Sequence, residues 1–395
     1  MKQGWEIKKL GEVCSLITDG DWIESRHQSE DGIRLIQTGN VGNGVFKAKD
    51  DKPHYISEST FTELGCTEIF AGDCLVSRLP DPVGRACIIP ETNCRMITAV
   101  DCSIIRFSSD IVSKFFIYYT QCEKYKRDID NNTTGTTRKR ISRKNLESIS
   151  LPIPPREEQE RIVEELDCLS CVIEKKRKQL RELDALAQSI FYTMFGDPIT
   201  NEKGWGIDRL GNMCEISSSK RIYAHEYCED GIPFYRGKEI TEKSKGNDIS
   251  VELYIAEDRY NELKRKFGVP QKGDILITAV GTIGNIWVVD SDTPFYFKDG
   301  NVLWLQIKDN INPIYFKTLL YNLIDKYKES MANGCAYSAL TIVNLKEMQT
   351  NKIPFVLQQQ FAEKIEKIEQ HKKLISQSIK ETEELFNARM AYYFN

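Results

Sequence analysis

Residues 151–198 read LPIPPREEQERIVEELDCLSCVIEKKRKQLRELDALAQSIFYTMFGDP, and this stretch decides the fold. Prolines stand near both of its ends, and neither Pro nor Gly interrupts residues 156–195. Apolar residues recur at alternating spacings of four and three, a pattern typical of a coiled-coil seam. The seam consists of Ile162, Leu166, Leu169, Ile173, Leu180, Leu183, Ala187, Ile190 and Met194, with Lys176 as its polar member.

The stretch predicts a single helix roughly 58 Å long at about 1.5 Å per residue. Acidic residues at Glu157, Glu158 and Glu160 favour its start, because the helix dipole is positive at that end. The helix is too polar to cross a membrane, so its apolar stripe needs a protein partner.

Residues 353–395 supply that partner, because they repeat the pattern 199 positions later. Pro354 and Gln358 correspond to Pro155 and Gln159, and the apolar positions follow in step. Each helix alone would be marginal in water, so we expect the two to pack together. The predicted interface consists of Ile162, Leu166, Leu169, Ile173, Leu180, Leu183 and Ile190 in the first helix, and of Phe361, Ile365, Ile368, Ile375, Ile379 and Phe386 in the second.

The repeat extends through the whole chain, at offsets of 199 to 201 residues. The segment GWEI at residues 4–7 returns as GWGI at 204–207, and GDCLV at 72–76 returns as GDILI at 273–277. A period this long indicates duplicated domains and not a solenoid. We expect a first domain over residues 1–155, a long helix over 156–197, a second domain over 198–354 and a second long helix over 355–395.

Each domain is predicted to be α+β, with a curved and mostly antiparallel sheet. Short β-rich runs separated by Gly, Asp and Pro turns predict strands in the first copy. One helix is expected over residues 113–127, with its counterpart over 313–327, and its aromatic residues should be core. The predicted strands cover residues 33–38, 74–77, 86–89 and 103–107.

The composition is that of a soluble globular protein, with 41% hydrophobic residues, 28% charged residues and a net charge of −4. Residues 1–13 lack the apolar segment of a signal peptide, and no apolar run is long enough to span a membrane. The chain has twelve cysteines, and its single C-x-x-C at Cys168 and Cys171 falls inside the predicted helix. We therefore expect a cytoplasmic protein with reduced thiols and no metal site.

Two segments resemble motifs of catalytic sites, but each lacks a residue that the motif requires. Residues 231–239, GIPFYRGKE, resemble a phosphate-binding loop, but Glu239 stands where Ser or Thr must bind magnesium. The run NPIY at 312–315 resembles an amino-methyltransferase motif without its second proline. Asn312 is better explained as a helix N-cap, with Pro313 in the first turn. The sequence predicts no catalytic residue.

One run has a strongly basic character. Residues 136–144 read TTRKRISRK, with five cations and no acid. Cations beside hydroxyl groups in a loop are suited to DNA phosphates, so we expect Thr136, Thr137, Arg138 and Lys139 to contact them. The basic runs at 175–178 and 264–266 are consistent with solvated helix faces.

Duplicated domains, each followed by a proline bend and a heptad helix, resemble the specificity subunit of Type I restriction–modification systems. The resemblance is carried by TTRKRI at 136–141 with Asn145 and Leu146, by LPIPP at 151–155 and by Glu158-Gln159. Trp5-Glu6 with LGEV at 10–13 is similar to the start of the family's domains. The second copy departs at its junction, where AYSAL at 336–340 lacks the basic run.

The resemblance implies a non-catalytic subunit of a DNA methyltransferase and endonuclease complex. Two target-recognition domains would each read half of a bipartite, asymmetric site on double-stranded DNA, joined by an antiparallel coiled-coil helix pair. Two modification subunits would carry S-adenosylmethionine and methylate adenine, and restriction subunits would add ATP- and Mg-dependent activity. No cofactor is expected in this chain.

Base-reading residues are expected among polar groups at glycine-rich turns, because amide and guanidinium groups make bidentate contacts to bases. In the first domain we predict Arg26, His27, Gln28, Gln37, Thr38, Asn40, Arg78 and Arg85. In the second domain we predict Lys220, Arg221, Tyr235, Arg236, Lys238, Thr278, Thr282, Asn285, Tyr337 and Ser338.

Three alternatives are compatible with the sequence to different degrees. A self-sufficient methyltransferase is disfavoured, because no cofactor-binding loop is present. The chain could be the DNA-recognition subunit of a modification-only or other restriction system, since its partners lie outside it. It could also be a coiled-coil scaffold that does not bind DNA, although the basic run at 136–144 argues against this.

Overall fold

The computed structural model describes residues 4–332 and 339–394. It divides into two compact units, which are described separately. The first unit consists of Met1–Arg177 with Gln377–Asn395, and the second of Lys178–Ser376. Each unit therefore combines one globular domain with parts of both long helices.

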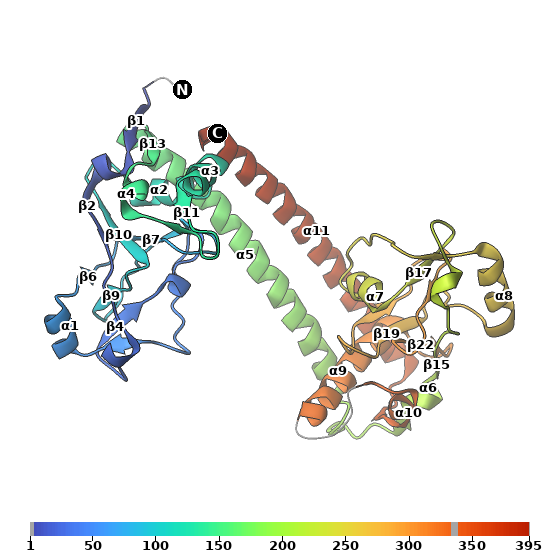
Figure 1. Ribbon diagram of the computed structural model, residues 1–395. Coiled ribbons are helices and arrows are strands. Elements are labelled where there is room, and N and C mark those ends of the chain that lie inside the picture. Colours follow the sequence, from blue (N-terminus) through green and yellow to red (C-terminus); the bar gives the residue numbers. More distant parts are fainter. Residues whose placement is uncertain (1–3, 333–338, 395) are drawn as a thin grey trace. The chain divides into compact units, whose positions relative to one another are not determined.

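The centre of the first unit is a four-stranded antiparallel sheet in the order β2-β10-β7-β8 (Figure 1). Its strands span Cys14–Asp19 (β2), Cys102–Phe107 (β10), Cys74–Ser77 (β7) and Ala86–Ile88 (β8). Side chains alternate between its faces. Cys74, Val76 and Ile105 pack against helices, whereas Leu75 and Ile104 pack against a second sheet.

The second sheet has the order β3-β5-β4-β9-β6, and its β4–β9 pair is parallel. Two shorter pairs complete the first unit, β1 with β13 and β11 with β12. The bounds are Gln28–Ser29 (β3), Tyr55–Ile56 (β5), Ile33–Ile36 (β4), Met96–Thr98 (β9), Glu68–Ile69 (β6), Glu6–Lys9 (β1), Ser150–Ile153 (β13), Thr133–Thr134 (β11) and Arg140–Ile141 (β12).

The second unit repeats this plan, which confirms the predicted duplication and α+β class. Its four-stranded sheet has the order β15-β22-β19-β20 and its other sheet the order β16-β18-β17-β21, with β14 and β23 as a separate pair. The bounds are Cys214–Ser217 (β15), Val302–Ile307 (β22), Ile275–Thr278 (β19), Ile286–Val288 (β20), Tyr227–Cys228 (β16), Tyr254–Ile255 (β18), Ile232–Tyr235 (β17), Tyr296–Phe297 (β21), Ile207–Arg209 (β14) and Gln349–Asn351 (β23).

The helix predicted over 113–127 is two helices in the structure, α2 (Ser113–Tyr119) and α3 (Glu123–Asn131). Two side chains account for the break. Thr120 Oγ1 donates to the carbonyl of Ile117, and the Cys122 sulfur accepts from the backbone N–H of Tyr125 as a new N-cap. Side-chain bonds to the backbone of this kind compete with a continuous helix.

The counterpart helix, α9 (Pro313–Ala332), is unbroken and longer than predicted. The predicted cap is confirmed, because the Asn312 side-chain oxygen accepts from the backbone N–H of Ile314 at 2.9 Å. The remaining helices are α1 (Glu58–Leu64), α4 (Arg143–Glu147), α6 (Leu210–Met213), α7 (Gly237–Ser244), α8 (Glu257–Phe267) and α10 (Ile342–Glu347).

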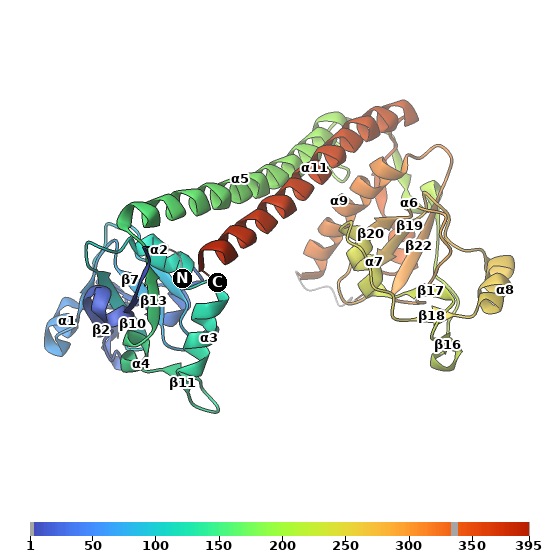
Figure 2. The ribbon, with the colours of Figure 1, turned by 90° about the horizontal axis from the view of Figure 1, so that it is seen from above.

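The long helices are α5 (Arg156–Phe195) and α11 (Phe355–Phe394), and they run antiparallel to each other (Figure 2). In the first unit the start of α5 contacts the end of α11, as Arg177 bonds to Glu383 and Glu165 to Arg389. In the second unit the end of α5 contacts the start of α11, as Asp184 bonds to Lys372 at 2.8 Å. The expected antiparallel pair is therefore present.

The end of α11 is also part of the first unit's core. Met390, Tyr393 and Phe394 are buried in the same cluster as Phe115 and Leu166. In the second unit, Phe191 and Phe195 at the end of α5 pack with Phe361 and with α9. Each long helix therefore ends inside the core of the other repeat's domain.

Candidate DNA interface

The basic run at 136–144 forms the tip and far strand of a β-hairpin and continues into the first turn of α4. Strands β11 and β12 pair through Thr133 with Ile141 and Thr134 with Arg140. Gly135 has φ +102°, and a Cβ there would come within 2.5 Å of the Arg138 carbonyl oxygen, so the turn requires glycine. In Figure 2 the hairpin projects from the first unit beside the label β11.

The four residues predicted to contact phosphates lie together at this tip. Thr136, Thr137, Arg138 and Lys139 are all exposed. Within the described part of the chain, neither Arg138 nor Lys139 forms an ion pair, whereas Arg140 pairs with Asp101 at 3.1 Å. The tip therefore presents two cations without a neutralising carboxylate, which suits a polyanion.

Arg78 lies at the base of this hairpin and is 7% exposed. Its Nε donates to the Ile141 carbonyl at 3.0 Å, and its guanidinium forms an ion pair with Asp19. The Arg78 carbonyl in turn accepts from the Ile141 backbone N–H at 3.2 Å. The side chain thus fastens the hairpin to the end of β7 and does not present its donors to solvent.

Arg85 is also buried, and its guanidinium donates to four backbone carbonyls. Nε bonds to Val41 at 2.7 Å, and one terminal nitrogen bonds to Thr38 at 2.8 Å. The other terminal nitrogen bonds to Leu79 and Pro82, both at 2.8 Å. Arg85 therefore ties the loop after β4 to the loop after β7, a positioning role that its sequence context did not reveal.

The loop after β4 holds three further predicted residues, and Asn40 organises it. The Asn40 side chain accepts from the Gln37 backbone N–H at 2.9 Å and donates to the Lys47 carbonyl at 2.8 Å. Gln37 and Thr38 are half-buried. Gln37 lines a cavity of about 280 Å³. Sequence reasoning missed the other polar residues of this cavity, which include Arg34, Lys49, Lys52 and His54.

The remaining predicted residues of the first unit lie in or directly after the short helix η2 (Ser25–His27). Arg26 is exposed and forms an ion pair with Glu24 at 2.8 Å. The His27 ring accepts from the Glu24 backbone N–H, and Gln28 bonds to His54 at 2.9 Å. Gln28 therefore lies next to the cavity that Gln37 lines.

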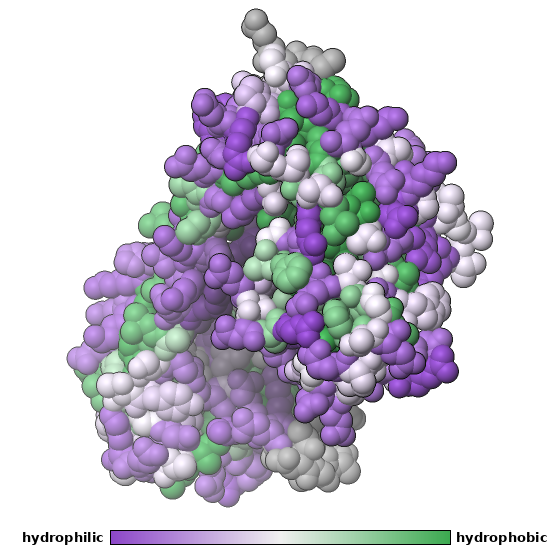
Figure 3. All heavy atoms as spheres, turned by 90° about the vertical axis from the view of Figure 1, so that its left-hand side faces the viewer, coloured by the Kyte–Doolittle hydropathy of each residue, from purple (hydrophilic) through white to green (hydrophobic). Residues whose placement is uncertain are grey.

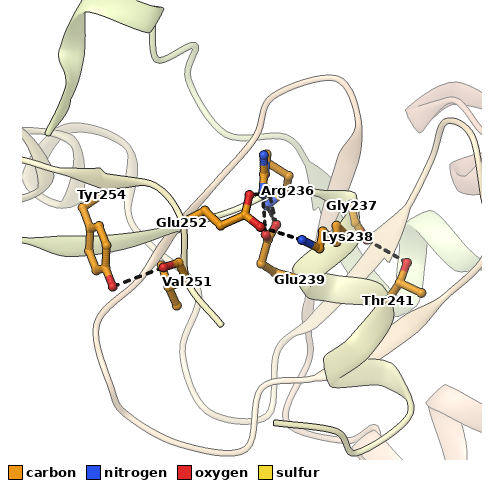
Figure 4. Close-up of polar contacts among 8 residues, drawn as sticks. All are labelled: Arg236, Gly237, Lys238, Glu239, Thr241, Val251, Glu252 and Tyr254. Carbon is orange, nitrogen blue, oxygen red and sulfur yellow. Dashed lines mark hydrogen bonds and ion pairs between the residues drawn. The ribbon is translucent and has the colours of Figure 1, made fainter. Parts of the chain in front are cut away.

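In the second unit, Arg236 and Lys238 form one network at the start of α7 (Figure 4). Arg236 bonds to Glu239 and Glu252, both at 2.8 Å, and Lys238 bonds to Glu252 at 2.6 Å. Hydrogen bonds from Lys238 and Arg236 lower the pKa of Glu252 to about 2. The Glu239 carboxylate accepts from the Arg236 backbone N–H at 2.8 Å and so caps the start of α7.

The other predicted residues of the second unit divide by burial. Lys220, Arg221 and Thr282 are exposed, and Arg221 pairs with Asp299 at 2.9 Å. Tyr235 is buried and stacks on Phe295, with the ring centroids 4.8 Å apart. Thr278 and Asn285 bond to each other and to the Thr282 carbonyl, so they shape the turn after β19. Tyr337 and Ser338 lie outside the described residues.

The predicted residues of the helix pair all lie along the facing stripes. Ile162, Leu166 and Phe361 are fully buried, and every other predicted interface residue is buried or half-buried. Sequence reasoning missed a polar cluster in the same pair. Arg389 and Tyr393 on α11 bond to the Glu165 carboxylate on α5.

Three further observations concern one face of the surface, metal-binding clusters and membrane-spanning helices in the described part of the chain. Hydrophilic side chains cover most of the face drawn in Figure 3, with smaller hydrophobic groups between them. Among the described residues there is no cluster of His, Cys, Asp and Glu that could hold a metal ion. None of the described helices has an apolar stretch long enough to cross a membrane.

Comparisons with known proteins agree with the duplicated architecture. A family model described as the Type I restriction modification DNA specificity domain matches residues 2–184 and again residues 202–384. The chain is 28% identical over 264 residues to a putative type I restriction enzyme specificity subunit of Haemophilus influenzae, covering 66% of each chain. It is 28% identical over 282 residues to the MjaIX specificity subunit of Methanocaldococcus jannaschii, covering 66% of this chain and 63% of that one. Both alignments thus span slightly less than two thirds of the relatives.

Two solved structures share the fold over nearly the whole chain. The S subunit of a Type I restriction–modification system from M. genitalium superposes with a TM-score of 0.57 at 15% identity, covering 99% of this chain and 97% of that one. A chain from a study of complex assembly in a type I system superposes with a TM-score of 0.61 at 17% identity, covering 100% and 98%. Because the family model matches most of the chain, in two copies, this protein belongs to the family of Type I restriction–modification DNA specificity proteins.

Proposed function

We propose that this chain is the subunit that selects the DNA sequence for a Type I restriction–modification complex. The observation that carries the proposal is the double match to the DNA specificity domain, once in each globular domain. The two copies differ in sequence, so each would read a different half of a bipartite site. The chain itself would contribute recognition and no catalytic step.

The exposed tip at Thr136–Lys139 supports a contact with DNA. A hairpin with unpaired cations would bind phosphates and set the position of the first domain on the duplex. Arg78 and Arg85 would act as positioning residues, because their donors are used by the protein's own backbone. Base contacts would come from the half-buried or exposed polar residues, among them Gln28, Gln37 and Lys220.

The second unit would read the other half-site with a different surface. Its cations Arg236 and Lys238 are already neutralised by Glu239 and Glu252. Electrostatic attraction would therefore be weaker there than at the first unit's hairpin. We propose that the first unit dominates the salt-dependent part of the affinity.

The helix pair would connect the two readers and carry the partner subunits. In the second unit it has an apolar groove of about 490 Å³ lined by Leu183, Leu186, Leu374 and Ile375. Leu374 is 68% exposed and Leu186 47% exposed, and both line this groove, so the groove presents a joined apolar surface to a protein partner. We propose that the modification subunits, which would hold S-adenosylmethionine, bind along these helices.

Binding of the purified chain to DNA tests the proposal. The affinity for duplexes selected from a random library is measured between about 50 and 200 mM salt. A DNA-reading subunit gives an enriched bipartite motif and an affinity that falls steeply as salt rises. A scaffold without a DNA role gives no enriched motif and no salt-dependent binding, and this result would refute the proposal.

A further inference from the structure

Among the described residues, the polar cluster of the helix pair occurs in the first unit and not in the second. Arg389 on α11 donates to both carboxylate oxygens of Glu165 on α5, and its bond to Oε2 measures 2.8 Å. Tyr393 donates to the same oxygen at 2.5 Å and accepts from Arg389 at 2.8 Å. The hydrogen bond from Arg389 lowers the pKa of Glu165, so the carboxylate is charged at neutral pH.

The corresponding place in the second unit has no such cluster. The repeat offset matches Glu165 with Lys364, Arg389 with Ile190 and Tyr393 with Met194. Lys364 is exposed and forms no ion pair with any described residue, and Ile190 is half-buried against the core of the second unit. The sequence repeat of the two helices therefore does not extend to these polar contacts.

A second asymmetry lies in the middle of the seam. Lys176 Nζ donates to the Ser378 hydroxyl at 2.5 Å and to the Thr382 hydroxyl at 3.3 Å. By the repeat offset, Ser378 and Thr382 correspond to Gln179 and Leu183. Lys176 on α5 therefore bonds to two hydroxyl groups of α11. The corresponding positions of α5, Gln179 and Leu183, carry no hydroxyl group.

These contacts bear on which helices can pair. Suppose the α5 helices of two copies paired in the same antiparallel register. Glu165 would then face Ile190 and Met194, which leaves its half-buried carboxylate without a partner, and Lys176 would face Gln179 and Leu183 in place of two hydroxyl groups. If two α11 helices paired instead, Arg389 would face Lys364, and like charges would repel. Only the unlike pair satisfies both Glu165 and Arg389.

We propose that these polar contacts make the helix interface selective, so that α5 fits α11 and rejects a second α5, and α11 rejects a second α11. The half of the chain that carries α5 therefore pairs with the half that carries α11, even when the two halves are separate polypeptides. An assembly built this way always contains two unlike globular domains. The inference rests on the helix contacts alone, so a chain that binds no DNA would leave it standing.

The test uses the full chain cut once, at a protease site inserted between residues 197 and 203, where α5 connects to β14. Light- and heavy-isotope preparations are cut, mixed, unfolded in urea and refolded by dilution. Native mass spectrometry then counts unlike pairs, which contain one α5 half and one α11 half, and like pairs, which contain two copies of the same half. Random pairing gives equal numbers of unlike and like pairs. We expect unlike pairs to outnumber like pairs by about tenfold, since charged groups in contact couple strongly. Equal numbers would overturn the proposal.

A double variant removes the contribution of the Glu165–Arg389 pair to the selectivity and leaves the Lys176 contacts in place. Glu165→Lys with Arg389→Ile gives each position the residue of its repeat counterpart, Lys364 or Ile190. In every combination of the two helices, a Lys then faces an Ile at this contact. The unlike fraction should fall toward the statistical half. The matched control, Glu164→Lys with Lys373→Ile, makes the same charge changes at exposed positions without ion pairs among the described residues, and should keep the selectivity.

A second measurement avoids refolding of the cut chain. A double-mutant cycle with Glu165→Gln and Arg389→Gln in the uncut chain measures the coupling of the two side chains in thermal unfolding. A selective contact requires that the two changes are clearly non-additive. Additive effects would mean that the pair contributes nothing to recognition between the helices, and the proposal would fail.

Discussion

Replacing Phe394 with Ala should destabilise the first unit, although the two segments of that unit are separated in sequence by the 199 residues of the second unit. Phe394 is 3% exposed and its ring lies 5.3 Å from that of Phe115 and 5.9 Å from that of Tyr119. Both partners belong to α2. The last turn of α11 therefore fills space that the first domain cannot fill with its own residues.

The magnitude follows from the burial. Removal of a fully buried Phe side chain costs about 3–5 kcal/mol, because the cavity left behind collapses only in part. Domains are typically stable by about 5–15 kcal/mol, so this is a large fraction of the first unit's stability. For a unit of this size the midpoint of thermal unfolding should fall by roughly 6–20 °C.

Calorimetry and hydrogen exchange measure this effect. The calorimetric transition of the first unit should move down while that of the second unit stays in place, and amides of α2 should exchange faster. The matched control is Tyr392→Ala, since Tyr392 is 59% exposed and should cost less than about 1 kcal/mol. Faster exchange confined to the end of α11, with α2 unchanged, would refute the assignment of this helix end to the first unit's core.

Three further predictions follow from the candidate interface. Arg138→Ala with Lys139→Ala should weaken binding to all DNA sequences and reduce the slope of log affinity against log salt by about two. The motif found by library selection should stay the same, and a changed motif would contradict the phosphate role. Arg85→Lys should lower the unfolding free energy of the first unit by about 2–3 kcal/mol, because a single ammonium cannot replace four hydrogen bonds to carbonyls. Arg26→Lys, at a side chain 75% exposed, is the control for that change and should leave thermal unfolding unaltered. Insertion of four residues beside Lys176 adds about 6 Å to α5 and rotates the seam by only ~40°, so the gap between half-sites should grow by one to two base pairs; an unchanged gap in the mapped motif would mean that the helices do not set the spacing.

The elements that the sequence predicts well are those with strong local signals. The four-and-three spacing from Ile162 to Met194 predicts α5 within a residue or two, and the repeat predicts α11. The runs at 74–77 and 86–89 become β7 and β8, because their apolar residues lie between turns that contain Gly, Asp or Pro. Periodicity and turn chemistry act within a few residues, so the sequence displays them directly.

The roles of the arginines could not be predicted in the same way. Arg78 and Arg85 stand in glycine-rich segments, as base-reading residues often do, but both are buried and bond to backbone carbonyls from distant loops. A backbone carbonyl is the same in every residue, so the sequence does not show which carbonyls will accept. Thr38 comes close to Arg85, and Ile141 to Arg78, only in the folded domain. The break between α2 and α3 was missed for a different reason. The bonds made by Thr120 and Cys122 reach only three residues along the chain, but no Pro or Gly marks the break in the sequence.

The pairing of Glu165 with Arg389 is an intermediate case. Both residues interrupt or flank a heptad stripe, and the repeat alignment shows Ile190 where Arg389 stands in the second copy. That substitution reads as a flaw in the stripe when α11 is considered alone. It becomes a specific contact once the antiparallel register places Arg389 beside the Glu165 carboxylate.

The central claim is that each globular domain reads one half of a divided DNA site, and mapping of adenine methylation tests it most directly. A host genome is sequenced for methylated adenine with and without the gene for this chain, with the modification subunit present in both strains. The account predicts methylation at a motif of two unlike half-sites with a fixed gap, present only in the strain that has the gene. The same methylation in both strains, or one continuous motif without a gap, would contradict it.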